Sequence, residues 1–254
     1  MGARWGKSAM KSLKGMSVLV TGGGSGIGLG TARYCIERGA RVTICGRRED
    51  KIQAAAAELG DACCGVAADV TLAADRQKLL EAAIHHGGQL DALINNAGNM
   101  YRGAITELDE TALQEVFHTN VIAAMMLTGL CTPSLAQKEG AVVFVGSIHT
   151  RRAFPGASPY AATKAAVQGL TRVLAAELGE QRVRVNCLLP GAVFTEINQR
   201  AGLMDDETPL QRLEGMSDLH ALGRIGTTEE IAEAMAYLIC AEWVTGAIID
   251  IDGG

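Results

Sequence analysis

Residues 16–28 read MSVLVTGGGSGIG, and this stretch decides the fold class. Its first six residues form a near-continuously apolar run, as expected of a strand that is covered on both faces of a parallel sheet. The glycines that follow allow a tight turn directly before a helical segment. A strand, a glycine-rich turn and a helix in this order favour a pyrophosphate site at the helix N-terminus. The spacing, from Thr21 to Gly28, is T-G-x-x-x-G-x-G rather than G-x-G-x-x-G.

Short apolar runs continue to alternate with longer helical segments along the chain. The apolar runs are 16–21, 41–45, 62–67, 90–95, 141–146, 183–188 and 247–251. The segments long enough for crossover helices are 28–38, 50–59, 72–85, 107–130, 159–178 and 228–239. Seven strands separated by helices predict an α/β protein with a Rossmann-like, doubly wound three-layer fold around a seven-stranded parallel sheet.

The alternating pattern contains no linker and no internal repeat, so we expect a single dinucleotide-binding catalytic domain over residues 15–254. Residues 1–14 are predicted to be an N-terminal tail. Residues 192–218 are polar and break the pattern after the sixth strand. Ligands bind at the carboxyl ends of the strands in such sheets, so this insertion is interpreted as a lid, with an ordinary surface loop as the alternative.

The composition of the chain argues against nucleic-acid-binding, membrane and metal-binding proteins. The chain has 23 Lys and Arg against 28 Asp and Glu, a net charge of −5, so no nucleic-acid partner is expected. No apolar run approaches the roughly 20 residues that span a bilayer, and no signal peptide is visible, so no membrane partner is expected either. The seven cysteines are odd in number and include no C-x-x-C pair. They predict free thiols, no metal site and a cytoplasmic location.

The end of the second predicted strand bears on the choice of cofactor. An acidic residue at this place accepts the ribose hydroxyls of NAD. This chain instead has Gly46, followed by Arg47 and Arg48. A guanidinium suits a 2′-phosphate by its charge and its bidentate geometry. The sequence therefore favours NADP(H); NAD stays possible, and a solvated basic turn is the alternative explanation.

Tyr160 and Lys164 lie four residues apart in a helical segment, which places both side chains on one helix face. A nearby ammonium favours the phenolate, so we expect the pKa of Tyr160 to fall below its ordinary value of about 10. A tyrosine tuned in this way can exchange a proton with an alcohol or a ketone near neutral pH.

Together, these motifs resemble those of the classical short-chain dehydrogenase/reductase family. In chain order they are Thr21-Gly22…Gly26-Ile27-Gly28, Asp69, Asn95-Asn96-Ala97-Gly98, Asn120, Ser147, Tyr160…Lys164 and Pro190-Gly191…Thr195. The resemblance covers roughly residues 14–254. It implies an enzyme that transfers a hydride between NADP(H), or NAD(H), and a carbonyl or secondary alcohol.

The resemblance also implies residue roles. Ser147 would bind the substrate oxygen, Tyr160 would be the general acid/base, Lys164 would bind the nicotinamide ribose and lower the Tyr160 pKa, and Asn120 would hold a water. The expected cofactor-binding residues are Gly22, Gly24, Ser25, Gly26, Ile27, Gly28, Arg47, Arg48, Asp69, Val70, Asn96, Ala97, Gly98, Tyr160, Lys164, Pro190, Gly191, Val193 and Thr195.

The resemblance implies a small-molecule ketone or alcohol as substrate, whose identity the sequence does not give. The candidate substrate residues are His149, Arg152 and Phe154, in the segment that borders the pocket in the family. Arg152 and its neighbour Arg151 would suit an anionic substrate, although solvated surface charges are the default for arginine. A 3-oxoacyl-thioester reductase and a non-catalytic dinucleotide-sensing regulator are the alternatives. The resemblance also implies a homo-oligomer, a dimer or a tetramer, assembled through segments 159–178 and 247–251.

Overall fold

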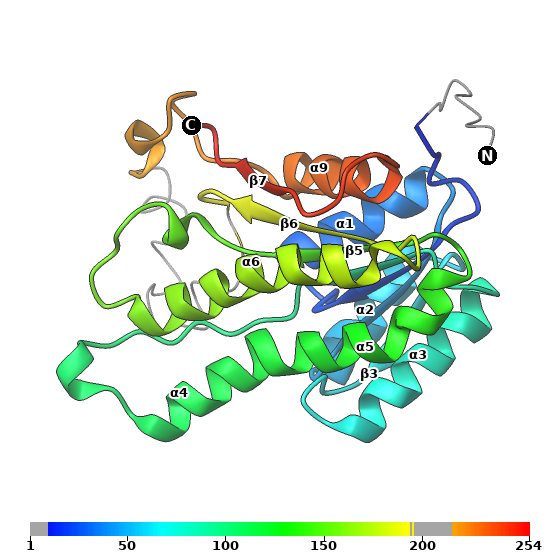
Figure 1. Cartoon of the computed structure of the whole chain (residues 1–254), viewed down its shortest axis with the longest axis horizontal. Coiled ribbons are helices and arrows are strands. Elements are labelled where there is room, and N and C mark those ends of the chain that lie inside the picture. The colour runs from blue at the N-terminus through cyan, green and yellow to red at the C-terminus, as the bar shows by residue number, and fades with distance from the viewer. Residues whose placement is uncertain (1–9, 194, 196–214) are drawn as a thin grey trace.

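The computed structural model describes residues 10–193, 195 and 215–254, arranged around a seven-stranded sheet (Figure 1). All neighbouring strands are parallel, in the order β3-β2-β1-β4-β5-β6-β7. The strands are β1 (Ser17–Thr21), β2 (Arg41–Gly46), β3 (Cys63–Ala67), β4 (Ala92–Asn95), β5 (Ala141–Val145), β6 (Arg184–Pro190) and β7 (Ile248–Ile251). The α-helices are α1 (Gly26–Glu37), α2 (Glu49–Leu59), α3 (Ala73–Gly87), α4 (Glu110–Phe117), α5 (Ala123–Ala136), α6 (Ser158–Gly179) and α9 (Thr228–Cys240). Shorter helical turns are η1 (Ile105–Glu107), η2 (His118–Ile122), η3 (Ile148–Thr150) and η4 (Ser217–Leu219).

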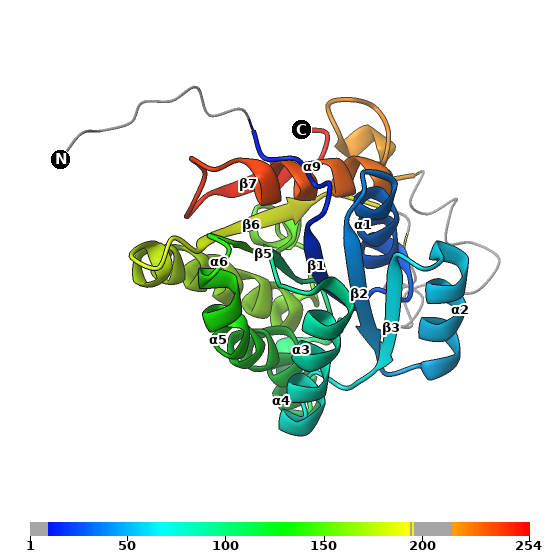
Figure 2. The ribbon, with the colours of Figure 1, turned by 90° about the vertical axis from the view of Figure 1, so that its right-hand side faces the viewer.

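The apolar strands are buried because each face of the sheet has its own core. Successive side chains of a strand point to opposite faces, so Val18 and Val20 pack with α1, α2 and α9, whereas Leu19 packs with α3, α5 and α6. Figure 2, an end view, shows α1 and α9 on one side of the sheet and α3, α5 and α6 on the other. The predicted three-layer, doubly wound α/β fold is confirmed.

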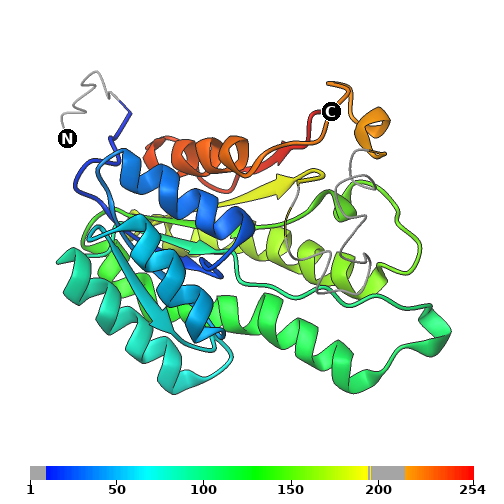
Figure 3. The ribbon, with the colours of Figure 1, turned by 180° about the vertical axis from the view of Figure 1, so that it is seen from behind.

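The strand order reverses at β1, which lies between β2 and β4. Connections leave β1 and β4 toward opposite faces at such a switch point and open a crevice at the carboxyl ends of the strands, where ligands bind. Figure 3 shows the connections at these ends gathered on the side away from the N-terminus. The fold thus brings the glycine turn after β1 next to the segment after β4.

Two element boundaries differ from the sequence expectation. The helix expected over 107–130 is three consecutive pieces, α4, the π-helical turn η2 and α5, and it continues to Ala136 because Leu135 is buried in the core. The tail expected over 1–14 ends earlier: Leu13 is only 4% exposed, and the Lys11 N–H donates to the Cys240 carbonyl. Residues 1–9 lie outside the described part.

One helical run, Glu110–Ala136, is long and apolar enough by length and composition to cross a membrane. Its residues Leu127, Cys131 and Leu135 are fully buried against the sheet, as in the core helix of a globular domain. Packing against the sheet therefore accounts for these buried residues, whereas Ile122, Met125 and Met126 of the same run are exposed.

Candidate active site

The turn between β1 and α1 depends on two glycines. Gly22 has φ +67°, in the left-handed region that favours glycine, and a Cβ there would lie 3.0 Å from the Ala97 Cα. A Cβ on Gly28 would clash with the Gly22 carbonyl oxygen and lie 2.6 Å from the Asn96 Nδ2. Gly28 therefore serves the close packing of α1 on the turn, and its side of the helix faces the protein.

The N-terminus of α1 is open toward this turn. Its N-cap residue, Ser25, makes no side-chain capping bond, and the first turn of the helix carries no acidic residue. Helix α9, by contrast, begins with a complete capping box between Thr227 and Glu230. The first backbone N–H groups of a helix need partners, and an anion satisfies them well. The α1 terminus is thus suited to a pyrophosphate.

Thr21 joins the ends of β1 and β4. Its hydroxyl donates to the Ile94 carbonyl (3.2 Å) and accepts from the backbone N–H groups of Asn96 (3.0 Å) and Ala97 (2.9 Å). The Asn96 side-chain amide returns to the Thr21 carbonyl at 2.8 Å. These bonds hold Asn96-Ala97-Gly98 beside the glycine turn.

Cationic side chains gather at the carboxyl end of β2. Arg47, Arg48 and Lys51 all line the cavity there. The Arg47 guanidinium has no hydrogen bond or ion pair within the described ranges, whereas Arg48 and Lys51 do have partners. Asp69, across the cavity, has a lowered pKa: burial raises it, but hydrogen bonds from Thr71 and the Arg47 charge more than offset that effect.

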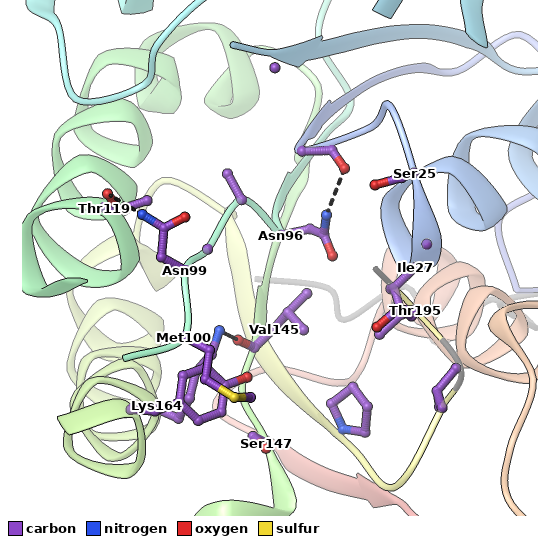
Figure 4. Close-up of a pocket in the computed structure, with 18 of the residues that line it drawn as sticks. Ser25, Ile27, Asn96, Asn99, Met100, Thr119, Val145, Ser147, Lys164 and Thr195 are labelled. Atoms are coloured by element: carbon purple, nitrogen blue, oxygen red, sulfur yellow. Dashed lines mark hydrogen bonds between the residues drawn. The ribbon is translucent and has the colours of Figure 1, made fainter. Parts of the chain in front are cut away.

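Tyr160 and Lys164 project from the first turns of α6, and both are almost fully buried, at 6% and 4% exposure. The Lys164 ammonium donates to the Val145 carbonyl at the end of β5 (2.7 Å) and lies 5.5 Å from the centre of the Tyr160 ring. Figure 4 shows Lys164 beside Val145, with Ser147 nearby. The four-residue spacing thus places both side chains in one site, next to Ser147.

The expected fall in the Tyr160 pKa is not found in this structure. Burial raises the pKa of Tyr160 to about 12, and the hydrogen bond with Ser147 only partly offsets that effect. Burial also lowers the pKa of Lys164 to about 8, because its ammonium has lost most of its contact with water. Lys164 is turned toward the Val145 carbonyl, so desolvation rather than the ammonium governs the phenol here.

Asn120 lies behind the site, in the π-helical turn between α4 and α5. Its side-chain oxygen accepts from the Asn99 N–H (2.8 Å), and its amide donates to the Asn99 carbonyl (2.9 Å) and the Thr163 hydroxyl (3.0 Å). Single π turns are frequent at functional sites. Asn120 therefore connects the segment after β4 to the helix that carries Tyr160 and Lys164.

Ser147 and His149 follow β5 and are in contact. Nδ1 of His149 lies 3.0 Å from the Ser147 Oγ, and the His149 backbone N–H also donates to that oxygen (3.3 Å). The His149 ring lies against Phe154 and edge-on to Tyr160. Burial, with the charges of Arg102 and Lys164, lowers the pKa of His149 to about 4.

A cavity of about 510 Å³ joins these groups, which is within the usual size range of ligand sites. In Figure 4, Ser25, Ile27 and Thr195 lie on one side of it and Asn99, Met100 and Lys164 on the other. The predicted site residues that line it are Gly22, Gly24, Ser25, Gly26, Ile27, Arg47, Arg48, Asp69, Val70, Asn96, Ala97, Gly98, Ser147, His149, Phe154, Tyr160, Lys164, Pro190, Gly191, Val193 and Thr195.

Three predicted residues do not line this cavity. Gly28 and Asn120 support it from behind. Arg152, expected at the substrate, instead donates to the Leu219 carbonyl (3.1 Å), and its neighbour Arg151 forms an ion pair with Asp250. Most of the expected lid, residues 194 and 196–214, lies outside the described residues, although Met216 from its end lines the cavity. No cluster of His, Cys, Asp or Glu suited to a metal occurs in the described ranges.

Sequence reasoning missed residues of the segment after β4. Asn99, Met100 and Arg102 line the cavity, as does Thr119 from η2. Arg102 donates to the Pro155 carbonyl (2.7 Å), and the next residue, Gly103, donates to the Gly156 carbonyl (2.9 Å). The segment is therefore joined to the one before α6. Arg102, directly downstream of the Asn-Asn-Ala-Gly motif, could have been noticed as a cation beside a known motif.

Comparison with known proteins gives consistent results. A family model described as short chain dehydrogenase matches residues 16–206. The dehydrogenase/reductase SDR family member 4 of Sus scrofa is 32% identical, over 99% of this chain and 91% of the relative. The 3-oxoacyl-[acyl-carrier-protein] reductase of Chlamydia muridarum is 32% identical, over 94% and 96%. The crystal structure of the 3-ketoacyl-(acyl-carrier-protein) reductase of Brucella melitensis complexed with NADH superimposes with a TM-score of 0.88 at 31% identity, over 96% of this chain and 99% of that chain.

Proposed function

We propose that this chain, which belongs to the short-chain dehydrogenase family of oxidoreductases, interconverts a carbonyl compound and a secondary alcohol with NADP(H). One observation carries the proposal: a buried Tyr160–Lys164 pair and Ser147 line the same cavity as the glycine turn at the α1 N-terminus. A dinucleotide that reaches from that turn to Tyr160 would bring its nicotinamide to the only buried tyrosine of the described residues.

The cavity fits such a cofactor. The uncapped α1 terminus would bind the pyrophosphate, and Asp69 and Val70 would lie beside the adenine. Lys164 and Tyr160 would bind the nicotinamide ribose. When bound, the nicotinamide supplies the hydride for reduction, or accepts it during oxidation.

The residues of this chain would handle the proton. The Tyr160 hydroxyl would donate its proton to the carbonyl oxygen, while the Ser147 hydroxyl binds the same oxygen. The Lys164 ammonium, freed from the Val145 carbonyl, would lower the cost of the phenolate that remains. Asn120, which bonds to Thr163 in the turn that carries Tyr160, would keep α6 aligned with the segment after β4.

NADP(H) is the proposed cofactor because of the charges at the end of β2. Three cations, Arg47, Arg48 and Lys51, surround the place where an NAD enzyme has a carboxylate. A 2′-phosphate would give the Arg47 guanidinium a partner in a charge-assisted hydrogen bond.

A second candidate is the reduction of a 3-oxoacyl thioester. Two of the compared relatives carry the name of such a reductase. Arg102 places a cation at the end of the cavity near His149, where the phosphates of a thioester carrier would find a counter-charge. Both candidates use the same Tyr160 chemistry and differ only in the substrate.

The proposed assembly is a homo-oligomer through α5 and α6. Ile122, Met125 and Met126 are 45–54% exposed, as is Val173 on α6 at 54%. Large exposed apolar patches are typical of interaction surfaces. The outer face of α6 also exposes Ala165, Gly169 and Ala176, which are small enough for close helix packing.

The test combines a substrate panel with Tyr160→Phe. Wild-type protein is assayed with NADPH and NADH on neutral ketones, oxo acids and 3-oxoacyl thioesters. Tyr160→Phe should lower kcat at least 100-fold, because the proton donor is lost, while the Kd for NADPH from fluorescence titration changes only a few-fold. Tyr237→Phe, on an exposed tyrosine of α9, is the matched control and should behave as wild type.

Two outcomes would contradict the proposal. Wild-type protein that binds NADPH but turns over nothing on the panel would favour a dinucleotide-sensing regulator. A Tyr160→Phe variant that keeps more than a few per cent of kcat would remove Tyr160 from the acid/base role.

A further inference from the structure

His149 makes a contact for which the proposed mechanism has no use. Its Nδ1 lies 3.0 Å from the Ser147 Oγ, and its backbone N–H lies 3.3 Å from the same atom. Both groups therefore form hydrogen bonds with the Ser147 Oγ, the atom that would bind the substrate carbonyl. A serine hydroxyl rotates to suit its neighbours, so these partners decide where its proton points.

The His149 ring is fixed in this position by its surroundings. Phe154 packs on it at 4.4 Å between ring centres and 33° between planes, and Tyr160 meets it edge-on at 5.2 Å and 87°. The ring is thus held between a cavity wall and the candidate proton donor, with Nδ1 directed at Ser147.

Burial and charge keep this imidazole neutral. The Arg102 guanidinium and the Lys164 ammonium face it, from the segment after β4 and from α6, and together with burial they lower the pKa of His149 to about 4. A neutral imidazole carries one proton, on either Nδ1 or Nε2, so Nδ1 can act as donor or acceptor without a change in charge.

The position of that proton has a consequence for Ser147. With the proton on Nδ1, both His149 groups donate to Oγ. The Ser147 proton is then available to Tyr160, the other hydrogen-bond partner of this hydroxyl, or to a substrate oxygen. With the proton on Nε2, the Ser147 hydroxyl instead donates its hydrogen bond to Nδ1, and only a lone pair of Oγ faces the substrate. A carbonyl oxygen needs the first arrangement, because it only accepts hydrogen bonds.

We propose that His149 is a positioning residue that orients the Ser147 hydroxyl, its Nδ1–H donating to Oγ so that the Ser147 proton points at the substrate carbonyl. This inference rests on the proposed carbonyl chemistry and adds a residue to it. Hydrogen bonds in a chain polarise one another, so the Nδ1–H also makes Ser147 a better donor.

Two variants separate this role from simple packing. His149→Phe keeps a ring between Phe154 and Tyr160 but has no donor, whereas His149→Asn loses the ring and keeps an amide near the position of Nδ1. The His149→Phe variant should lower kcat roughly 10- to 100-fold, the range for an orphaned polar group, with the Kd for NADPH unchanged. The His149→Asn variant should have a kcat within about fivefold of wild type. The reverse order, an active His149→Phe variant and an inactive His149→Asn variant, would show a packing role and overturn the inference.

A double-mutant cycle tests whether His149 acts through Ser147. In a Ser147→Ala background, His149→Phe should cause no further loss of kcat, because the hydroxyl that it orients is gone. Independent, multiplied losses would contradict the proposal. Wild-type turnover on the panel is measured first, and its absence would reject the proposed function together with this inference. Wild-type turnover with an unaffected His149→Phe variant would reject the inference alone.

A measurement without substrate or cofactor completes the test. In ¹⁵N-histidine NMR spectra, the signals missing from His149→Phe identify the His149 ring. Ser147→Ala should shift the Nδ1 signal, because its hydrogen-bond partner is removed, and should leave the other histidines in place. An unchanged Nδ1 signal would mean that the two side chains do not interact in solution.

Discussion

Tyr160 and Arg47 line the same cavity, but their surroundings affect their ionisation and charge in different ways. Tyr160 is buried, so its pKa follows desolvation more than its charged neighbour. Arg47 lines the opposite end, where its charge still reaches Asp69. The pKa of the buried Tyr160 is therefore set mainly by desolvation, whereas the charge of Arg47 stays available for a ligand.

Removal of the Arg47 charge should weaken NADPH binding selectively. A hydrogen bond to a charged group contributes about 1.5–3 kcal/mol, so Arg47→Ala should raise the Kd for NADPH roughly 10- to 150-fold and change that for NADH by less than threefold. Fluorescence titration of both cofactors at low salt measures this. Arg182→Ala, at an exposed ion pair with Glu139 remote from the cavity, controls for net charge. Equal losses for both cofactors would argue against a 2′-phosphate contact at Arg47.

Helix α1 can pack closely on the turn after β1 because the glycines at this place have no side chain. Gly28 lies where the first turn of α1 meets the Gly22 carbonyl, and the side-chain amide of Asn96, just after β4, donates to that carbonyl. Any Cβ at Gly28 would have to push α1 away from the sheet, and the uncapped helix terminus would move with it.

Gly28→Ala should therefore harm both stability and cofactor binding. Overpacking of this kind costs about 1–3 kcal/mol, which urea unfolding would detect, and the Kd for NADPH should rise in parallel. The matched control is Gly179→Ala, at the C-terminal end of α6, where a Cβ meets nothing within 4 Å. That change should be neutral or stabilise by about 0.5–1 kcal/mol. A Gly28→Ala variant as stable as wild type would show that α1 can shift freely.

The proposed oligomer concerns the surface of the whole chain rather than the cavity. Met125 and Met126 lie half-exposed on α5. Helix α6 packs on the same side of the sheet, and its exposed residues include Ala165, Gly169, Val173 and Ala176. The residues behind this surface include Asn120, so a partner copy would brace the helices that position the site.

A charge on this surface should break the assembly. Met126→Glu would have to bury a carboxylate between two copies, so light scattering should show a shift to a lower mass, with unfolding at a lower temperature. Leu72→Glu, at the start of α3 and 55% exposed, is the control and should leave the mass unchanged. A wild-type protein that is a monomer at all concentrations would reject the proposed assembly.

The sequence determined the architecture because this fold follows from local patterns of apolar and polar residues along the chain. Seven apolar runs separated by helical segments suffice to predict a doubly wound parallel sheet, since strands covered on both faces and right-handed crossovers leave few other arrangements. The glycine turn and the Tyr160–Lys164 pair could be predicted as site residues for the same reason, because each is a short motif whose spacing reflects local geometry. Ser147, a single residue, was predicted only through the resemblance to the family.

Only the tertiary structure decided what lies between these motifs. Burial of Tyr160 outweighs the effect that its neighbour Lys164 was expected to have on its pKa, and burial depends on the whole fold. Arg152 and Arg102 have the same chemistry, yet the packing of distant segments turns Arg152 toward Leu219 and places Arg102 in the cavity. The contact of His149 with Ser147 also needs a ring position set by Phe154 and Tyr160. Sequence patterns fix which way a chain turns locally, whereas desolvation and side-chain direction depend on residues that only folding brings together.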